Sequence, residues 1–333
     1  MSLLSRLGAV LLGCNLSAAA AAPALGPMWL TESGPGKAAK ASRGAEARGS
    51  YTEGESMDNT HGATKHLWLR AGDDVSAAGF VKPNGMPATV CLIDGAGQRR
   101  DLRAADQNGW YHVQVDLPEL GFYNAYLVRS SVDAGVLDVN VAKAELLKGT
   151  CCVKNANDEL TRTAINSEAP LELVRTHLPE EGLFTRLSSG DTLNFTVLAN
   201  GKPRAGATVT MITQQGWKKS AIADGEGRVS FTLIRDYFPS WNDFQRRHQE
   251  TFLVVAEHEE QTAGGALNGE RYSATRYRAT LSGNYYPSSA DYRSYAIGLG
   301  VGLFVVAFGG LAIFLFRRRR LKPYREVRFH ESY

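Results

Sequence analysis

The fold class of this chain is decided by residues 192–234, TLNFTVLANGKPRAGATVTMITQQGWKKSAIADGEGRVSFTLI. Apolar and polar residues alternate in TLNFTVLANG and in ATVTMIT, which is the period-two pattern of strands that are buried on one face. The sequence Asp224–Gly225–Glu226–Gly227 is typical of a hairpin turn, and the strand RVSFTLI follows it. Residues 192–234 therefore predict a series of strands joined by glycine-rich turns.

The same pattern extends in both directions along the chain. Residues 65–150 contain HLWLRAG, ATVCLID and WYHVQVDL, with Asn108–Gly109 as a turn signal, and a polar linker at residues 151–168 separates them from residues 169–285. Many short strands at a spacing of about 8–12 residues, with little amphipathic helical pattern, favour β-sandwiches. We therefore expect an all-β fold of two tandem Ig-like or transthyretin-like β-sandwich domains, residues 65–150 and 169–285.

The C-terminal region differs from the rest of the chain. Residues 296–316 carry no charge, and four arginines at positions 317–320 follow directly. A helix of this length reaches roughly 30 Å, the thickness of the hydrocarbon core of a bilayer. A buried helix in a globular core would be shorter and would carry a polar stripe, which this segment lacks. Because Lys and Arg collect on the cytoplasmic side, we expect one transmembrane helix and a basic cytoplasmic tail at residues 317–333.

The N-terminus resembles a bacterial export signal. Residues 1–22 combine one arginine, an apolar stretch and an alanine-rich cleavage region, which predicts a signal peptide. The sequence LLGC also resembles a lipoprotein cleavage box, so lipidation of Cys14 is the alternative. Residues 23–64 lack hydrophobic periodicity and predict a disordered leader. Together with the C-terminal anchor, these features predict a single-pass protein of the bacterial inner membrane whose β-domains lie in the periplasm.

Charge and cysteine content limit the partners and the chemistry. The net charge is +3 over 333 residues, and because the short tail supplies much of the positive charge, nucleic acid is not an expected partner. Three cysteines follow the signal peptide: Cys91, Cys151 and Cys152. An oxidising compartment favours one disulfide, most simply between Cys91 and one of the adjacent pair. A vicinal Cys151–Cys152 bond, a metal site and a free buried thiol are the alternatives.

Residues 201–233, GKPRAGATVTM…ADGEGRVSFTL, resemble the transthyretin-like and carboxypeptidase-regulatory-like β-sandwiches. The wider arrangement, from HLWLRAG to ADGEGRVSF, resembles a bacterial domain family of unknown function that is described as a periplasmic component of nickel transport. This resemblance covers about residues 65–260 and implies a periplasmic protein linked to the uptake of a transition metal ion such as nickel or cobalt. The family's opening histidine corresponds to His66, which here follows a leader and so departs from the family's pattern.

Recognised catalytic motifs are absent from the sequence. It contains no G-x-S-x-G, H-E-x-x-H, C-x-x-C, P-loop or dinucleotide fingerprint, so we expect no enzymatic activity. Imidazoles suit nickel, cobalt, copper and zinc alike, and the candidate metal ligands are His66, His248 and His258, with Glu257 as a helper. An isolated histidine on a strand is more often hydrogen-bonded or solvated, which is the interpretation we favour for His112.

Two further groups of residues are candidates for contacts with other proteins. The sequence DYFPSWNDF places four aromatic side chains in a predicted loop, either as a partner-binding surface or as a cover over one end of a sandwich: Tyr237, Phe238, Trp241 and Phe244. Three glycines share one face of the apolar span and predict close packing with another helix: Gly298, Gly302 and Gly309.

The sequence therefore predicts a non-enzymatic, membrane-anchored periplasmic accessory protein for transition-metal uptake or handling. The alternative is an Ig-like interaction or scaffold module of a cell-envelope complex with no metal ligand. The expected partners are the inner membrane and either a metal-transport membrane protein or a second copy of the chain that packs through the anchor.

Overall fold

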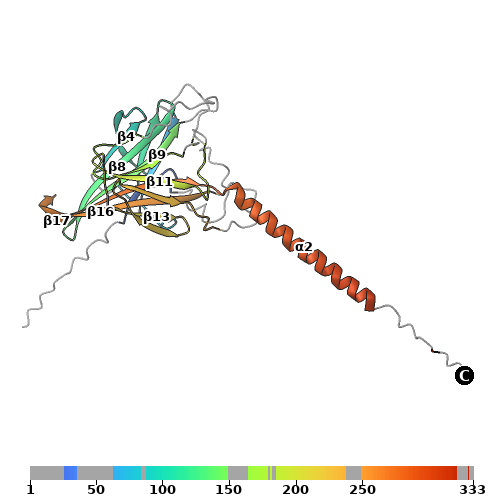
Figure 1. The fold of residues 1–333 in the computed structure, drawn as a ribbon. Helices are drawn as coiled ribbons and strands as arrows, with labels where there is room; N and C mark the ends of the chain where they lie inside the picture. The colour runs from blue at the N-terminus through green and yellow to red at the C-terminus, as the bar shows by residue number, and fades with distance from the viewer. Residues whose placement is uncertain are drawn as a thin grey trace, which may run out of the picture.

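The computed structural model describes residues 26–35, 63–83, 88–148, 164–178, 181, 185–237, 249–320 and 329. Within these residues the chain forms three β-sheets and one long helix near the C-terminus (Figure 1). The predictions of an all-β fold and of a single apolar helix after it are therefore confirmed.

Two of the three sheets are small and lie on the outside of the fold. The first outer sheet has the order β1-β2-β7-β6, with β3 paired to β2: β1 (Met28–Thr31), β2 (Ala63–Ala71), β3 (Gly79–Phe80), β6 (Ala104–Gln107) and β7 (Trp110–Leu117). The second outer sheet has the order β10-β11-β12, with β15 paired to β11: β10 (Glu172–Thr176), β11 (Thr192–Ala199), β12 (Lys202–Pro203) and β15 (Arg228–Thr232).

The third sheet, called the central sheet below, is the largest and has eight strands. Its order is β14 (Lys218–Ile222), β13 (Thr208–Thr213), β16 (Glu250–Leu267), β17 (Glu270–Tyr285), β9 (Val136–Lys148), β8 (Gly121–Asp133), β4 (Thr89–Asp94) and β5 (Arg99–Leu102).

The central sheet joins the two predicted domains. Strand β17, from the second domain, pairs in parallel with β9, from the first, so that Ala274 lies opposite Val136 and Ser282 lies opposite Ala144. A parallel pair requires a long connection between its strands, and here residues 149–269 provide it. The two predicted sandwiches therefore share one continuous sheet, which the sequence did not predict.

The two outer sheets cover opposite faces of the central sheet. Along β4, Val90 and Leu92 belong to the core under the first outer sheet, whereas Cys91 and Ile93 belong to the core under the second. Successive side chains of a strand point to opposite faces, so β4 contributes to both cores at once. Burial on both faces explains why β8 and β9 carry long buried runs without the alternation expected of a half-exposed strand.

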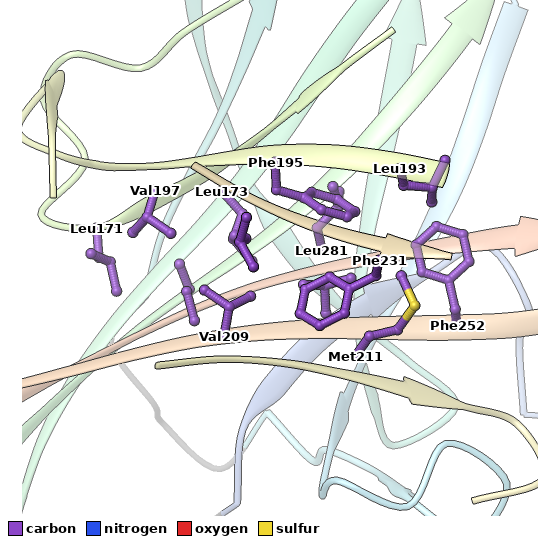
Figure 2. Packing of buried hydrophobic residues seen from close by; sticks show 14 of the residues in the cluster. Leu171, Leu173, Leu193, Phe195, Val197, Val209, Met211, Phe231, Phe252 and Leu281 are labelled. Carbon is purple, nitrogen blue, oxygen red and sulfur yellow. The ribbon is translucent and has the colours of Figure 1, made fainter. Parts of the chain in front are cut away.

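The second core is the more aromatic of the two. Phe195 of β11 and Phe231 of β15 pack with ring centroids 6.4 Å apart, and Figure 2 shows them above Met211 of β13. The alternation of TLNFTV and RVSFTL therefore has the predicted consequence, because every second residue of these strands enters this core.

Residues 28–31 correct the prediction of a disordered leader at residues 23–64. They form β1, which pairs antiparallel with β2, and Met28, Trp29 and Leu30 are each 0% exposed. The apolar triplet is too short to show a period, so its partner strand, more than thirty residues later, decides its structure. Residues 23–25 and 36–62 of the predicted leader lie outside the described residues.

The hairpin turns match their sequences. Asn108 and Gly109 both have positive φ, 56° and 82°, as a two-residue type I′ turn requires, and they connect β6 to β7 as predicted. Asn268 and Gly269 have φ values of 51° and 89° and connect β16 to β17 in the same way.

The last element is α2 (Ser289–Arg320), which contains residues 296–320, a segment long and apolar enough to cross a membrane. No part of this segment is buried against the rest of the protein. The helix extends away from the β-sheets (Figure 1).

Candidate interaction face of the central sheet

Strands β8, β9, β16 and β17 extend beyond the two cores, and one face of this extension carries charged side chains. The strand registers place them in two cross-strand rows: Glu257, Arg278, Asn140 and Arg129 in one row, and Glu259, Arg276, Asp138 and Ser131 in the other. We call these eight residues the ladder face. It lies on the same side of the central sheet as the first outer sheet. Residues two apart on a strand share a face, and Val255, two residues before Glu257, and Ala142, two residues after Asn140, are buried on that side.

Ion pairs connect most of the ladder face. Asp138, which is 5% exposed, lies 3.5 Å from Arg276 Nη1 and 3.3 Å from Arg278 Nη1. The Nε atoms of these two arginines donate to Glu259 at 3.1 Å and to Glu257 at 2.7 Å. Asp138, Arg276 and Arg278 each contact two partners, which fixes these charges in position.

The ladder face is remote from the helix. Residues 276 and 278 lie in the middle of β17, whereas the end of β17 at Tyr285 is four positions before α2 begins at Ser289. At about 3.3 Å per residue, Arg278 lies roughly 23 Å along the strand from Tyr285. Figure 1 accordingly shows the hairpin of β16 and β17 at the end of the β-sheets opposite to α2.

Among the predicted metal ligands, the structure brings His66 next to His112, which we had not favoured as a ligand. The two imidazoles lie on β2 and β7 on the outer face of the first outer sheet, with His66 Nδ1 2.9 Å from His112 Nε2. Trp68 packs on the His112 ring at 5.0 Å, and burial together with the nearby His66 lowers the pKa of His112. Both effects disfavour the protonated form of His112.

His258 and Glu257 do not form the predicted pair. They are consecutive residues of β16, so they point to opposite faces: Glu257 pairs with Arg278, and His258 contacts Arg204 on the other side. Burial and the Arg204 guanidinium both lower the pKa of His258, and a neighbouring cation opposes metal binding. His248 lies outside the described residues. In the described part of the chain, no group of three His, Cys, Asp or Glu side chains could hold a metal ion.

Tyr237 is not on an exposed partner surface. It is 4% exposed and belongs to the second core, where its ring lies 6.5 Å from that of Tyr285. This residue therefore corresponds to the alternative prediction, a cover over the sandwich. The other three aromatic residues of the predicted surface, Phe238, Trp241 and Phe244, lie outside the described residues.

The cysteine and glycine predictions are only partly addressed by the structure. Cys91 is a free thiol, 3% exposed in the second core, and burial raises its pKa. Cys151 and Cys152 lie outside the described residues, so the structure gives no support for a bond from Cys91 to either. Gly298, Gly302 and Gly309 lie on exposed turns of α2, and close packing with another helix stays a prediction.

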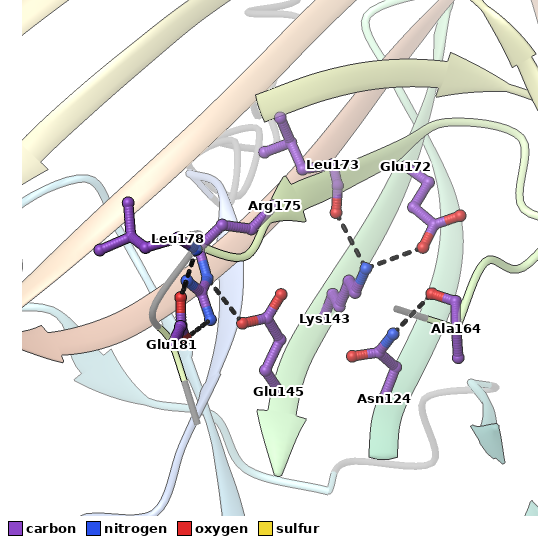
Figure 3. Close-up of polar contacts among 9 residues, drawn as sticks. All are labelled: Asn124, Lys143, Glu145, Ala164, Glu172, Leu173, Arg175, Leu178 and Glu181. Carbon is purple, nitrogen blue, oxygen red and sulfur yellow. Dashed lines mark hydrogen bonds and ion pairs between the residues drawn. The ribbon is translucent and has the colours of Figure 1, made fainter. Parts of the chain in front are cut away.

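A buried charge network connects β10 to β8 and β9 (Figure 3). Lys143 and Glu172, both 1% exposed, form an ion pair at 2.8 Å, and the Tyr126 hydroxyl donates to Glu172 at 2.6 Å. Burial, and then the Glu172 carboxylate, raise the pKa of Tyr126. Because each polar atom of the Lys143–Glu172 pair meets a partner inside the protein, we assign this pair a structural role.

A second part of the network surrounds Arg175. Its guanidinium donates to Glu145 at 2.9 Å and to both oxygens of Glu181 at 2.7 and 2.8 Å. Burial opposes the charge of Arg175, but the two carboxylates outweigh this effect and raise its pKa. These side chains line a cavity of about 270 Å³ between β9, β10 and β17, which is small for a substrate site.

No family model matches the sequence, and no curated protein is similar to it in sequence. Among solved structures, the chain is similar to a 1.5-MDa bacterial ice-binding adhesin, with 12% identity over 69% of this chain and 58% of the other and a TM-score of 0.21. It is also similar to the D0–D1 domains of intimin, with 11% identity over 66% and 90% of the two chains and a TM-score of 0.21. A two-domain fibronectin type III segment of chicken tenascin gives 10% identity over 68% and 93% and a TM-score of 0.17. Similarities at this level carry no argument about function.

The ladder face was not predicted from the sequence. Its charged residues come from four strands, and the parallel pairing of β9 with β17 brings Asp138 to Arg276 and Arg278 across more than 130 positions. The alternating charges in AEHEE and TRYR are the only local signal. Only the strand register shows that these charged residues lie together on one face of the sheet.

Proposed function

We propose that this chain is a non-enzymatic interaction module that one transmembrane helix holds at a membrane, with the ladder face available to a partner protein. One observation carries the proposal: strand β17 bears two arginines of the ladder face in its middle. Four residues after its end, the helix that contains the unburied apolar segment begins. A surface held far from the lipid and fixed by ion pairs suits recognition of a second protein in the same compartment.

The orientation we propose follows from charge. Arg317–Arg320 end the apolar span, and Lys and Arg collect on the cytoplasmic side, so the β-sheets would lie on the periplasmic side of a bacterial inner membrane. Protease treatment of intact spheroplasts tests this orientation. The added protease should digest the β-sheets, whereas an epitope tag after Tyr333 should be protected.

Site-specific photo-cross-linking in cells tests the interaction. A photo-reactive amino acid at Glu259, which is exposed on the ladder face, should give a discrete cross-linked product of higher mass. The matched control is Lys219, which is also exposed and lies on β14, and which should give no product. A membrane-bound chain that gives no product at Glu259, or the same products at both positions, would contradict the proposal.

Metal binding is the second candidate, and the contact between His66 and His112 is the observation that favours it. Two imidazoles whose nitrogens lie 2.9 Å apart could bind one nickel, cobalt, copper or zinc ion after a small rotation of the rings. In the described part of the chain, His66 and His112 are the only two histidines whose imidazoles contact each other.

Titration of the detergent-solubilised full chain with Ni²⁺, Co²⁺, Cu²⁺ and Zn²⁺ tests this candidate. Stoichiometric binding should be lost in His66→Ala and in His112→Ala and should persist in His258→Ala. Binding no tighter than millimolar for all four ions would exclude metal capture at this pair.

A further inference from the structure

Arg129 differs from the other two arginines of the ladder face. Arg276 and Arg278 each contact two carboxylates, whereas Arg129 contacts none within the described residues. Its one recorded hydrogen bond is a weak donation from Nη1 to the sulfur of Met28 at 3.6 Å. A guanidinium on the same face is thus left without the counter-charge that its neighbours have.

This absence is costly because Arg129 is partly buried. Burial lowers the pKa of its guanidinium, and no carboxylate lies close enough to offset the effect. Burying a charge without pairing it costs free energy, so an unpaired and half-buried guanidinium is destabilising for the free protein.

Asn140 is the second unsatisfied group, and it lies directly beside Arg129. The register of β8 and β9 sets the two residues opposite each other on the same face, where Cβ atoms are about 5 Å apart. Asn140 is 4% exposed, and its Oδ1 has no hydrogen-bond partner. A buried amide without a partner is uncommon in native proteins and calls for an explanation.

Ser131 completes the group. It follows Arg129 by two residues on β8, so its hydroxyl points to the same face, and no hydrogen bond of this hydroxyl is recorded in the described part of the chain. A guanidinium without a carboxylate partner, a hydroxyl, and an amide oxygen without a donor therefore lie together on two neighbouring strands. The guanidinium and the hydroxyl can donate hydrogen bonds to an oxyanion, and the amide oxygen of Asn140 can accept one from an N–H group.

We propose that Arg129, Ser131 and Asn140 form a binding site for a carboxylate, supplied by an acidic segment of the partner protein that the proposed function requires. A carboxylate accepts two parallel hydrogen bonds from the fork of a guanidinium, and the amide oxygen of Asn140 can accept from a backbone N–H of the bound segment. This inference rests on the proposed function and specifies which chemical group of the partner is recognised.

The neighbouring charges favour a singly charged ligand. The paired part of the ladder face holds three carboxylates, Asp138, Glu257 and Glu259, and only two guanidiniums. With Arg129 the ladder face has three guanidiniums and three carboxylates, so one bound carboxylate gives it a net charge of −1. A phosphate dianion would add a second negative charge next to these carboxylates and is disfavoured.

The site can be tested on the full chain in detergent by fluorescence anisotropy. The probe is a labelled peptide of Gly-Ser repeats with interspersed Glu, and the comparison peptide carries Gln at the same positions. The Glu peptide should bind and the Gln peptide should not. Arg129→Met, which keeps an apolar stem against Met28, should weaken binding at least tenfold, whereas the single-charge control Lys219→Met should change it less than twofold. Arg129→Lys should give an intermediate loss because it keeps the charge without the fork.

Thermal stability separates a binding role from a structural one. Because Arg129 is unpaired, Arg129→Met should leave the Tm unchanged or raise it, and the Glu peptide should raise the Tm of the wild type only. The proposal is overturned if Arg129→Met lowers the Tm and binds the peptide as before, or if both peptides bind equally. Absence of binding at millimolar Glu peptide, or equally good competition by inorganic phosphate, also overturns it. If the cross-link at Glu259 persists in Arg129→Met, the interaction stands and only this site fails.

Discussion

Truncation of Trp29 tests whether the N-terminal strand is part of the fold. Trp29 is fully buried between the loop at Val75 and Ala78 and the strands that carry Ile212, Leu253 and Val255. Its Nε1 donates to the Gly72 carbonyl at 3.1 Å, and the guanidinium of Arg70 lies 4.6 Å from its ring centroid.

The expected loss follows from these contacts. Replacement of a buried tryptophan by alanine costs about 3–5 kcal/mol for lost burial and the cavity that remains. The lost hydrogen bond adds about 1 kcal/mol, so Trp29→Ala should lower the free energy of unfolding by about 4–6 kcal/mol. This is a large part of the roughly 5–15 kcal/mol that ordinary domains have, so the variant should be close to unfolding.

Urea denaturation of the detergent-solubilised chain, followed by circular dichroism, measures this loss. Trp29→Phe, which keeps most of the buried area, should lose less than Trp29→Ala. Glu32→Ala, in the same segment but exposed, should change stability by less than about 0.5 kcal/mol. A loss below about 1 kcal/mol for Trp29→Ala would refute the burial of β1 and would restore the prediction of a disordered leader.

Three further predictions concern the buried network, the histidine pair and the helix. Glu172→Gln leaves the Lys143 ammonium buried without its counter-ion and should cost about 3–5 kcal/mol in urea denaturation, and Lys143→Met in the same chain should recover most of it. The lowered pKa of His112 means that the unfolded chain binds its proton more readily, so stability should be fully present above about pH 6.5 and lost as the pH falls below it. Urea midpoints near pH 7.5 and pH 5.5 should differ less in His112→Gln, and an identical difference would contradict the assignment. Gly298→Leu with Gly302→Leu should abolish cross-linked complexes that form through α2 without changing the Tm of the β-sheets, and unchanged cross-linking would exclude these glycines from the contact.

The shared central sheet has a consequence for stability. Mutations in β8 or β9 affect both cores, since the side chains of these strands enter the first core on one face and the second core on the other. We therefore expect the two sandwiches to unfold together and not as independent domains.

Local patterns were sufficient for the elements themselves. Alternation in TLNFTVLA, ATVTMIT and RVSFTL predicted strands and the faces they bury, and Asn108–Gly109 predicted a hairpin turn. The apolar segment of residues 296–316 predicted a membrane-spanning helix from its length and composition alone. These features depend on residues close in the chain, where backbone preference and periodic burial act directly.

Tertiary structure alone decided how these elements combine. The parallel pairing of β17 with β9 made one central sheet from two predicted domains, and β1 became a buried strand only because β2 offers it an edge. The same pairing brought Arg276 and Arg278 to Asp138 and so assembled the ladder face. Each of these results depends on which distant strand lies next to which. A strand's own sequence specifies its period and its buried face, but edges of similar strands offer nearly equivalent hydrogen bonds, so the choice of neighbour is made by the packing of the whole chain.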